Sequence, residues 1–81
     1  MTPTRYFFTV LDGKLIVDDE GTLCSSWADM RLQAIELAGA CLKDLAPHYP
    51  AGMEWQMVVT NEAKEAVLKL RFSLSEPGAP A

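Results

Sequence analysis

The residues that could do chemistry in this chain are few and widely spaced. The single histidine, His48, lies close to Pro47 and Pro50, and neither a second histidine nor a cysteine stands at a ligand spacing from it. A zinc site needs at least three such ligands, and nucleophilic catalysis needs a nucleophile, a base and a group that orients the base. We therefore expect no metal, no cofactor and no enzymatic activity.

The two cysteines, Cys24 and Cys41, form no metal-ligand pair such as CxxC. On a helix that begins near Ser26, they would lie roughly 22 Å apart at about 1.5 Å per residue. The Cα atoms of a disulfide approach within about 7 Å, so we expect two free thiols, with Cys41 as a small core residue. Free thiols are typical of a reducing compartment, and the expected location is the cytoplasm.

Three consecutive acids, Asp18, Asp19 and Glu20, are the other group with chemical potential. A calcium-binding EF-hand spreads its ligands over about twelve residues and closes with a glutamate, so this run is too compressed. We expect a solvated acidic turn. The glycines occur singly, which excludes a phosphate-binding loop built from several glycines.

Composition sets the class of protein. The chain has 81 residues, of which 49% are hydrophobic and 22% charged, with a net charge of −4. This balance predicts a folded single domain, expected over residues 1–74, with residues 75–81 as a disordered tail. The negative charge opposes wrapping of a long nucleic acid. No apolar run approaches the roughly 20 residues of a bilayer span, so no membrane association is expected.

Two hairpins and one helix account for the periodic segments. Apolar runs at residues 5–11 and 14–17 are separated by Asp12-Gly13, which predicts a hairpin with a type I′ turn. Ser26 followed by Asp29 is an acidic variant of the capping box and predicts a helix start. Apolar residues then recur with a helical period as far as Leu45. Alternation at residues 53–60 and 68–74 predicts a second hairpin.

These elements predict an α+β fold of the order ββαββ, in which one long helix packs on one face of a four-stranded antiparallel sheet. The chain directions permit a sheet with the second strand at one edge, followed by the first, third and fourth strands. Period-two alternation sends Phe8, Val10, Leu15 and Val17 toward the helix, together with alternate residues of the last two strands.

The opposite face of this sheet is expected to be open, because one helix cannot cover both faces. It is predicted to gather basic and apolar side chains. The candidate interface residues are Arg5, Phe7, Leu11, Ile16, Val58, Val67, Lys69 and Arg71. A contiguous apolar group on an exposed sheet is typical of an interface. Antiparallel sheets also commonly leave one face solvated, and both interpretations stay open at this point.

Two functions are compatible with such a face. The first is an interaction domain that forms a homodimer or binds another protein through the open face or an exposed edge strand. The alternative is a nucleic-acid-binding sheet, with Phe7 stacking on a base while basic residues meet phosphates. Those basic residues are Arg5, Lys14, Lys69 and Arg71. A single aromatic residue and the negative net charge weigh against the alternative.

The opening of the chain resembles a family of small bacterial proteins known as a domain of unknown function. The resemblance rests on an Arg-Tyr-Phe-Phe start, an Asp-Gly turn and an Asp-x-x-Gly stretch. The matching positions are Arg5, Tyr6, Phe7, Phe8, Asp12, Gly13, Asp18 or Asp19, and Gly21. Thr9 departs from the pattern, because many relatives carry an acid there, and this makes the open face more cationic. The resemblance implies a stand-alone or fused domain of soil-dwelling or plant-associated bacteria, and it carries over no activity and no functional residue.

Overall fold

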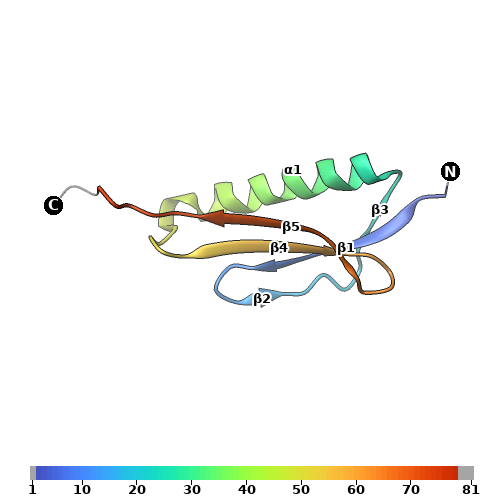
Figure 1. Cartoon of the computed structure of the whole chain (residues 1–81), viewed down its shortest axis with the longest axis horizontal. Helices are drawn as coiled ribbons and strands as arrows, with labels where there is room; N and C mark the ends of the chain where they lie inside the picture. The colour runs from blue at the N-terminus through green and yellow to red at the C-terminus, as the bar shows by residue number, and fades with distance from the viewer. Residues whose placement is uncertain (1, 79–81) are drawn as a thin grey trace.

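The alternating segments of the sequence form strands of an antiparallel sheet, and the segment with helical period lies across one face of it (Figure 1). This arrangement comes from a computed structural model, which describes residues 2–78. The molecule is elongated, with extents of 56 × 21 × 18 Å. Its elements are β1 (Thr4–Leu11), β2 (Leu15–Ile16), β3 (Thr22–Cys24), α1 (Trp27–Leu45), the 3-10 helix η1 (Ala46–His48), β4 (Glu54–Thr60) and β5 (Ala66–Ser73).

The sheet has the order that the chain directions permit. Its strands run β2-β1-β4-β5, and every neighbouring pair is antiparallel. A fifth strand, β3, pairs with the first residues of β1, on the same edge as β2. The predicted fold class is thus confirmed, although the sheet is larger than the four strands expected. The strand β3 escaped prediction because three residues are too few to show an alternation.

The helix begins where the capping residues predict. Ser26 is the N-cap, and its Oγ accepts a hydrogen bond from the backbone N–H of Asp29 at 3.0 Å. The Asp29 carboxylate in turn accepts the N–H of Ser25 at 2.8 Å, and this bond lowers the pKa of Asp29. The N–H of Asp29, an otherwise unpaired donor of the first turn, and the N–H of Ser25 just before the N-cap are both satisfied in this way. Within the described residues no helix is long and apolar enough to cross a lipid bilayer.

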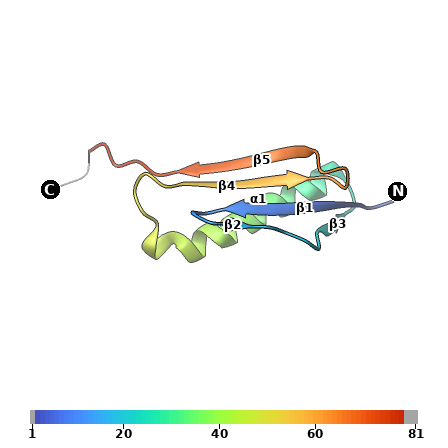
Figure 2. The ribbon, with the colours of Figure 1, turned by 90° about the horizontal axis from the view of Figure 1, so that it is seen from below.

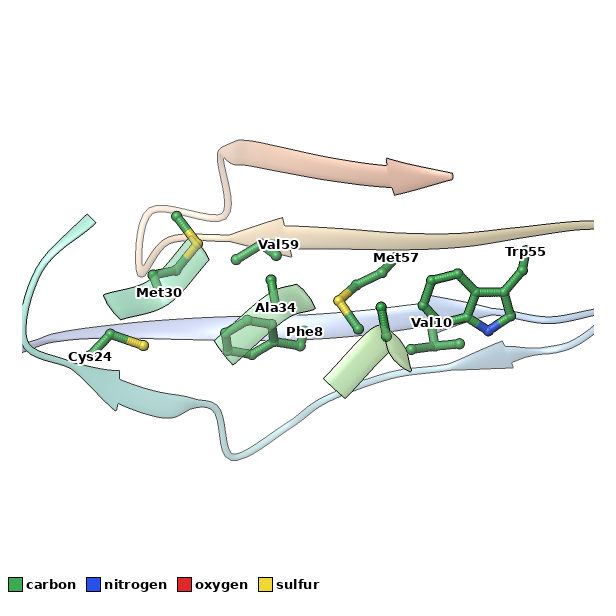
Figure 3. Packing of buried hydrophobic residues seen from close by; sticks show 9 residues of the cluster. Phe8, Val10, Cys24, Met30, Ala34, Trp55, Met57 and Val59 are labelled. Atoms are coloured by element: carbon green, nitrogen blue, oxygen red, sulfur yellow. The ribbon is translucent and has the colours of Figure 1, made fainter. Parts of the chain in front are cut away.

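The core lies between α1 and the central strands β1 and β4. Figure 3 shows Met30 and Ala34 of the helix clustered with Phe8, Met57 and Val59, and Trp55 beside Val10. Small residues at Ala34 and Ala38, both buried, let the helix lie close to the sheet. The apolar stripe of the helix is wider than the face the sheet covers, because Leu32, Ile35 and Leu37 are exposed.

Both cysteines are free. Cys24 is fully buried at the end of β3, and burial raises the pKa of its thiol, which favours the unreactive protonated form. Cys41 is partly buried and packs against the core, as the helical period predicted. Burial also raises the pKa of the Cys41 thiol.

The first hairpin forms, but the prediction of a type I′ turn in it is wrong. Leu11 pairs with Leu15, so the loop holds three residues, Asp12, Gly13 and Lys14, instead of two. A type I′ turn needs positive φ at both central residues. Here Gly13 has φ +99°, while the one non-glycine residue with positive φ in residues 2–78 is Lys64.

This single extra loop residue reverses the faces of β2. Directly opposite residues of an antiparallel pair share a face, so Ile16 lies on the helix side with Val10, and Leu15 lies on the open side with Leu11. The prediction that Leu15 and Val17 point toward the helix is therefore wrong. Their side chains are 64% and 55% exposed, respectively.

The second hairpin contains an irregularity that also moves one residue. The pairing shifts between Val59 and Thr60, because Val59 lies opposite Leu68 while Thr60 lies opposite Ala66. Val67 is the extra residue of this β-bulge, and it packs against the core. Beyond β5, the described part of the predicted tail, residues 75–78, contains no helix or strand, and residues 79–81 lie outside the described chain.

Candidate functional site

Most of the candidate interface residues do share the open face of the sheet, which Figure 2 shows with α1 behind it. On β1 they alternate with the buried Phe8 and Val10, and on β5 Lys69 and Arg71 lie opposite Val58 and Gln56 of β4. The candidates on this face are Arg5, Phe7, Leu11, Val58, Lys69 and Arg71.

Two candidates do not belong to this group. Ile16 lies on the helix side of β2, opposite Val10, because of the longer loop. Val67 packs against the core because of the bulge in β5. Sequence alternation missed two others, Leu15 and Val17, which the shifted register brings to the open side. Only the true length of the Asp-Gly loop would have revealed them.

A hollow of about 500 Å³ lies on the open face at the end of the sheet where β4 finishes. Its floor is formed by Phe7, Thr9 and Thr60, which come from neighbouring strands. One wall is the segment after β2, and the other is the turn between β4 and β5. The lining residues are Phe7, Thr9, Val17, Asp18, Asp19, Thr60, Glu62 and Lys64. Its volume falls in the range of small-molecule sites.

The first wall is fixed by the Asp18 carboxylate. Oδ2 accepts the backbone N–H of Phe8 at 2.9 Å, and Oδ1 accepts those of Gly21 at 2.9 Å and Glu20 at 3.2 Å. Partial burial tends to raise the pKa of Asp18, but the three N–H donors outweigh this and lower it. Asp18 is thus a structural carboxylate, so the prediction of three solvated acids is wrong at this residue.

Gly21 allows this wall to approach β1. Its φ is +71°, and a Cβ atom there would lie 2.7 Å from the Tyr6 carbonyl oxygen and 2.9 Å from the Phe7 side chain. Both the backbone angle and the contact exclude a larger residue. Asp18 and Gly21 together therefore explain the Asp-x-x-Gly stretch as a structural motif, with Asp18 as its acid.

The second wall is the turn at residues 61–65. The Asn61 side-chain oxygen accepts the backbone N–H groups of Ala63 and Glu65, both at 3.0 Å. The N–H of Lys64 donates to the Asn61 carbonyl at 3.0 Å. Lys64 itself has φ +64°, a conformation that favours glycine or asparagine. The Asp18 carboxylate thus holds the first wall of the hollow by hydrogen bonds, and Asn61 holds the second.

Charge is distributed unevenly along the open face. The hollow carries the carboxylates of Asp18, Asp19 and Glu62 and one ammonium, that of Lys64. Toward the other end of the strands, Arg71 Nε and Nη2 both donate to Glu54 at 3.0 Å. Lys69 lies between the two ends, opposite Val58. The Arg71 hydrogen bonds lower the pKa of Glu54 and raise that of Arg71.

A second hollow, of about 200 Å³, lies between the end of α1 and the end of β5. Tyr49 and Phe72 meet in it edge to face, with ring centroids 5.3 Å apart, and the Tyr49 hydroxyl donates to the Met53 carbonyl at 3.0 Å. This hollow is mostly apolar, and its lining residues are Leu42, Ala46, Tyr49, Phe72 and Leu74.

The described residues contain no group of three histidine, cysteine or acidic side chains that could hold a metal ion. The open face carries exposed apolar side chains along β1 and β2, a hollow lined by three carboxylates and one ammonium, and the Arg71–Glu54 ion pair. The sequence matches the model of a domain of unknown function, DUF6894, over residues 5–73. The chain belongs to this family. No curated protein and no solved structure matches it.

Proposed function

We propose that this DUF6894 domain is a protein-interaction domain whose binding surface is the open face of the sheet. The observation that carries the proposal is the apolar strip along β1 and β2. Leu11, Leu15 and Val17 are 43%, 64% and 55% exposed, and the half-buried Phe7 and Val58 continue the strip across the face. A contiguous apolar patch bordered by polar residues is typical of a protein interface.

The charges favour a protein over a nucleic acid as the partner. Acidic side chains line the hollow beside Phe7, where a stacked base would bring its phosphates. Arg71 is already paired with Glu54, and the Arg5 guanidinium donates to the Glu20 carbonyl at 2.7 Å. The cations on which phosphate binding would depend are therefore partly engaged.

The setting we propose is the bacterial cytoplasm. Two observations support it. Cys24 and Cys41 remain free, which suits a reducing compartment. The Arg-Tyr-Phe-Phe opening resembles small bacterial domains.

Substitution of one exposed leucine on each layer tests the proposal. Leu15→Ser removes an open-face side chain, while Leu32→Ser removes a helix side chain that is 56% exposed. Neither change opens a cavity, so both variants should fold. We expect Leu15→Ser to abolish the self-association or partner capture that the wild type shows, while Leu32→Ser preserves it. Light scattering gives the native mass, and pull-down with mass spectrometry identifies a captured protein.

Two results would contradict the proposal. Association that survives Leu15→Ser and is lost with Leu32→Ser would move the binding surface to the helix layer. Co-purifying nucleic acid, seen as excess absorbance at 260 nm and lost with Leu15→Ser, would favour the nucleic-acid alternative instead.

A further inference from the structure

The outer edge of β5 is a long strand edge that nothing in the described chain covers. On the other side of the sheet, β2 and β3 both pair with β1, and Asp18 holds the segment between them to β1. Within residues 2–78 no strand pairs with the outer edge of β5, which runs for eight residues. An edge of this length presents backbone donors and acceptors with which another extended chain can pair.

The hydrogen bonds of β1 determine which pairs of the neighbouring strands are bonded. The N–H of Phe8 donates to Asp18, away from β4, so Phe8 and its β4 partner Val59 do not exchange hydrogen bonds. Bonded and non-bonded pairs alternate along an antiparallel ladder, and the two backbone groups of one residue point to the same side. Val59 and the alternate residues of β4 therefore direct their backbone groups toward β5.

The same alternation continues into β5. Leu68, Leu70 and Phe72 lie opposite the β4 residues whose backbone groups point toward β5. The backbone groups of the residues between them, Lys69 and Arg71, therefore point away from β4 and into the free edge. These outward groups recur about every 6.8 Å, at a rise of about 3.4 Å per residue, which is the spacing of the matching groups on another extended chain.

An apolar hollow adjoins this edge on the helix side. It is the second hollow, of about 200 Å³, between the end of α1 and the end of β5. Figure 2 shows α1 running obliquely behind the strands, so that its last turns lie toward the β2 side, and Phe72 stays 41% exposed. On an added strand, the position opposite Phe72 would be a non-hydrogen-bonded pair, in which side chains approach most closely. A side chain at that position would reach the second hollow.

The charges of β5 select among strands. A second copy of β5, paired antiparallel around Leu70, would place Lys69 directly opposite the partner's Arg71, and like charges in that position destabilise a sheet pair. Arg71 is held by Glu54 in the one ion pair of residues 2–78. Lysine on an edge strand opposes indiscriminate pairing, and an acidic side chain on the incoming strand would turn this repulsion into attraction.

We propose that the free edge of β5 binds an extended segment of another protein as an added strand. An apolar side chain of that segment occupies the second hollow beside Phe72, and an acidic side chain lies opposite Lys69. Because Phe72 and Lys69 are three positions apart and on opposite sides of the sheet, the two side chains of the segment are three positions apart as well. This surface is separate from the open face, so the domain would have two binding surfaces.

Selection of a displayed library of random peptides against the purified domain tests the proposal. Peptides of about ten residues reach the upper length of an ordinary strand. We expect the selected sequences to share an apolar residue and an acid three positions apart. A selected synthetic peptide, titrated into the isotope-labelled domain, should shift the amide resonances of Lys69 and Arg71 more than those of Phe7 and Val58. A library without any selected sequence, or shifts confined to the open face, would overturn the inference.

Two substitutions at Arg71 isolate the backbone contribution. Arg71→Thr removes the side chain and keeps the outward N–H, whereas Arg71→Pro removes both. Proline is tolerated on an edge strand where the N–H faces solvent, and circular dichroism with urea unfolding verifies that both variants fold. We expect Arg71→Thr to bind the selected peptide about as well as the wild type and Arg71→Pro to bind it about fivefold or more weakly. Equal affinities of the two variants would contradict strand addition.

Side-chain variants test the hollow and the charge without changing the backbone of β5. Ala46→Phe fills part of the second hollow and should weaken the peptide about fivefold or more. Lys69→Glu should weaken it about threefold or more, and a peptide in which lysine replaces the acid should recover the loss. Lys43→Glu makes the same change of charge at an exposed position of α1 and should leave the affinity unchanged. Affinity that is indifferent to both Ala46→Phe and Lys69→Glu would overturn the proposed side-chain contacts.

Leu15→Ser separates this inference from the proposed function. The variant lies on the open face and should leave peptide binding unchanged. If Leu15→Ser abolishes peptide binding and Arg71→Pro preserves it, the peptide occupies the open face, and the edge inference fails while the proposed function stands. If the edge binds the peptide as expected and Leu15→Ser has no effect on any association of the domain, the proposed function fails and the edge inference stands.

Discussion

The β5 edge of the sheet is one strand of eight residues, paired with β4 along its length. The opposite edge of β1 is divided between β2, with two residues, and β3, with three. In the β5 edge, the long edge, many backbone pairs and apolar cross-strand contacts together hold the strand in place. In the divided edge, the chain leaves the sheet between Ile16 and Thr22 and returns. One carboxylate and one glycine hold that excursion in place.

This difference shows where single residues matter most. At the centre of the divided edge, the N–H of Phe8 has no strand partner and instead donates to the Asp18 carboxylate. Gly21 brings the same segment against the backbone of Tyr6. Changes at these two positions should therefore affect stability more than changes at comparable polar positions of the β5 edge or of the loops.

The largest effect is expected for Gly21→Ala. The new Cβ would lie 2.7 Å from the Tyr6 carbonyl oxygen at a φ of +71°, so both contact and conformation are unfavourable. Gly13→Ala is the matched control, since Gly13 also has positive φ, +99°, but no atom lies within 4 Å of its Cβ position. We expect both variants to lose the conformational term of about 1–2 kcal/mol. Gly21→Ala should lose a further 1–3 kcal/mol or so from the forced contact.

Urea unfolding followed by circular dichroism measures this difference in the free energy of unfolding. Equal losses for the two glycine variants would mean that the close approach of residue 21 to β1 contributes nothing. The divided edge would then be no more sensitive than an ordinary loop.

The next effect is expected for Asp18→Asn. An amide cannot accept on both sides, so its NH2 group would face either the N–H of Phe8 or those of Glu20 and Gly21. We expect a loss of about 1–3 kcal/mol. Asp19→Asn is the control: Asp19 is the neighbouring exposed acid, and its loss should change stability little.

The same carboxylate makes stability depend on pH. The folded-state pKa of Asp18 is lowered, so its contribution is complete above the unfolded pKa of about 3.9 and is lost as the pH falls through the folded value. Denaturant unfolding between neutral pH and about pH 2 should therefore show a steeper acid decline for the wild type than for Asp18→Asn. Parallel curves for the two proteins would mean that Asp18 is ionised equally in the folded and unfolded states.

Regular parts of the fold were predictable because their physical causes are repeated along the sequence. The alternation of residues 53–60 and 68–74 predicted β4 and β5, and Ser26 with Asp29 predicted the start of α1. The observed sheet order is one that the chain directions permitted once these elements were placed. Each of these predictions draws on several residues that agree, so one misplaced residue does not change the result.

The candidate face was predicted less completely, because each error depends on one residue. Asp12-Gly13 predicted the hairpin but not the third loop residue, Lys14, and one residue of register reverses a whole strand. The β-bulge that turns Val67 toward the core cannot be recognised from the sequence, because Val67 lies in a run of apolar residues. The role of Asp18 depends on Phe8, which is ten residues away in the chain and beyond the reach of a local pattern.

The smallest effect is expected on the long-edge side, at the turn that leads into β5, and it should be a gain. Lys64 holds φ +64°, which for a residue with a Cβ costs roughly 1–2 kcal/mol, whereas glycine adopts it freely at an entropic cost of about 0.5–1 kcal/mol. Lys64→Gly should therefore raise the free energy of unfolding by about 0.5–1 kcal/mol. Ala63→Gly, in the same turn without positive φ, should lower it by a similar amount. If both variants lose stability, the Lys64 side chain contributes more to the turn than its backbone strain removes, and the long edge also depends on a single residue.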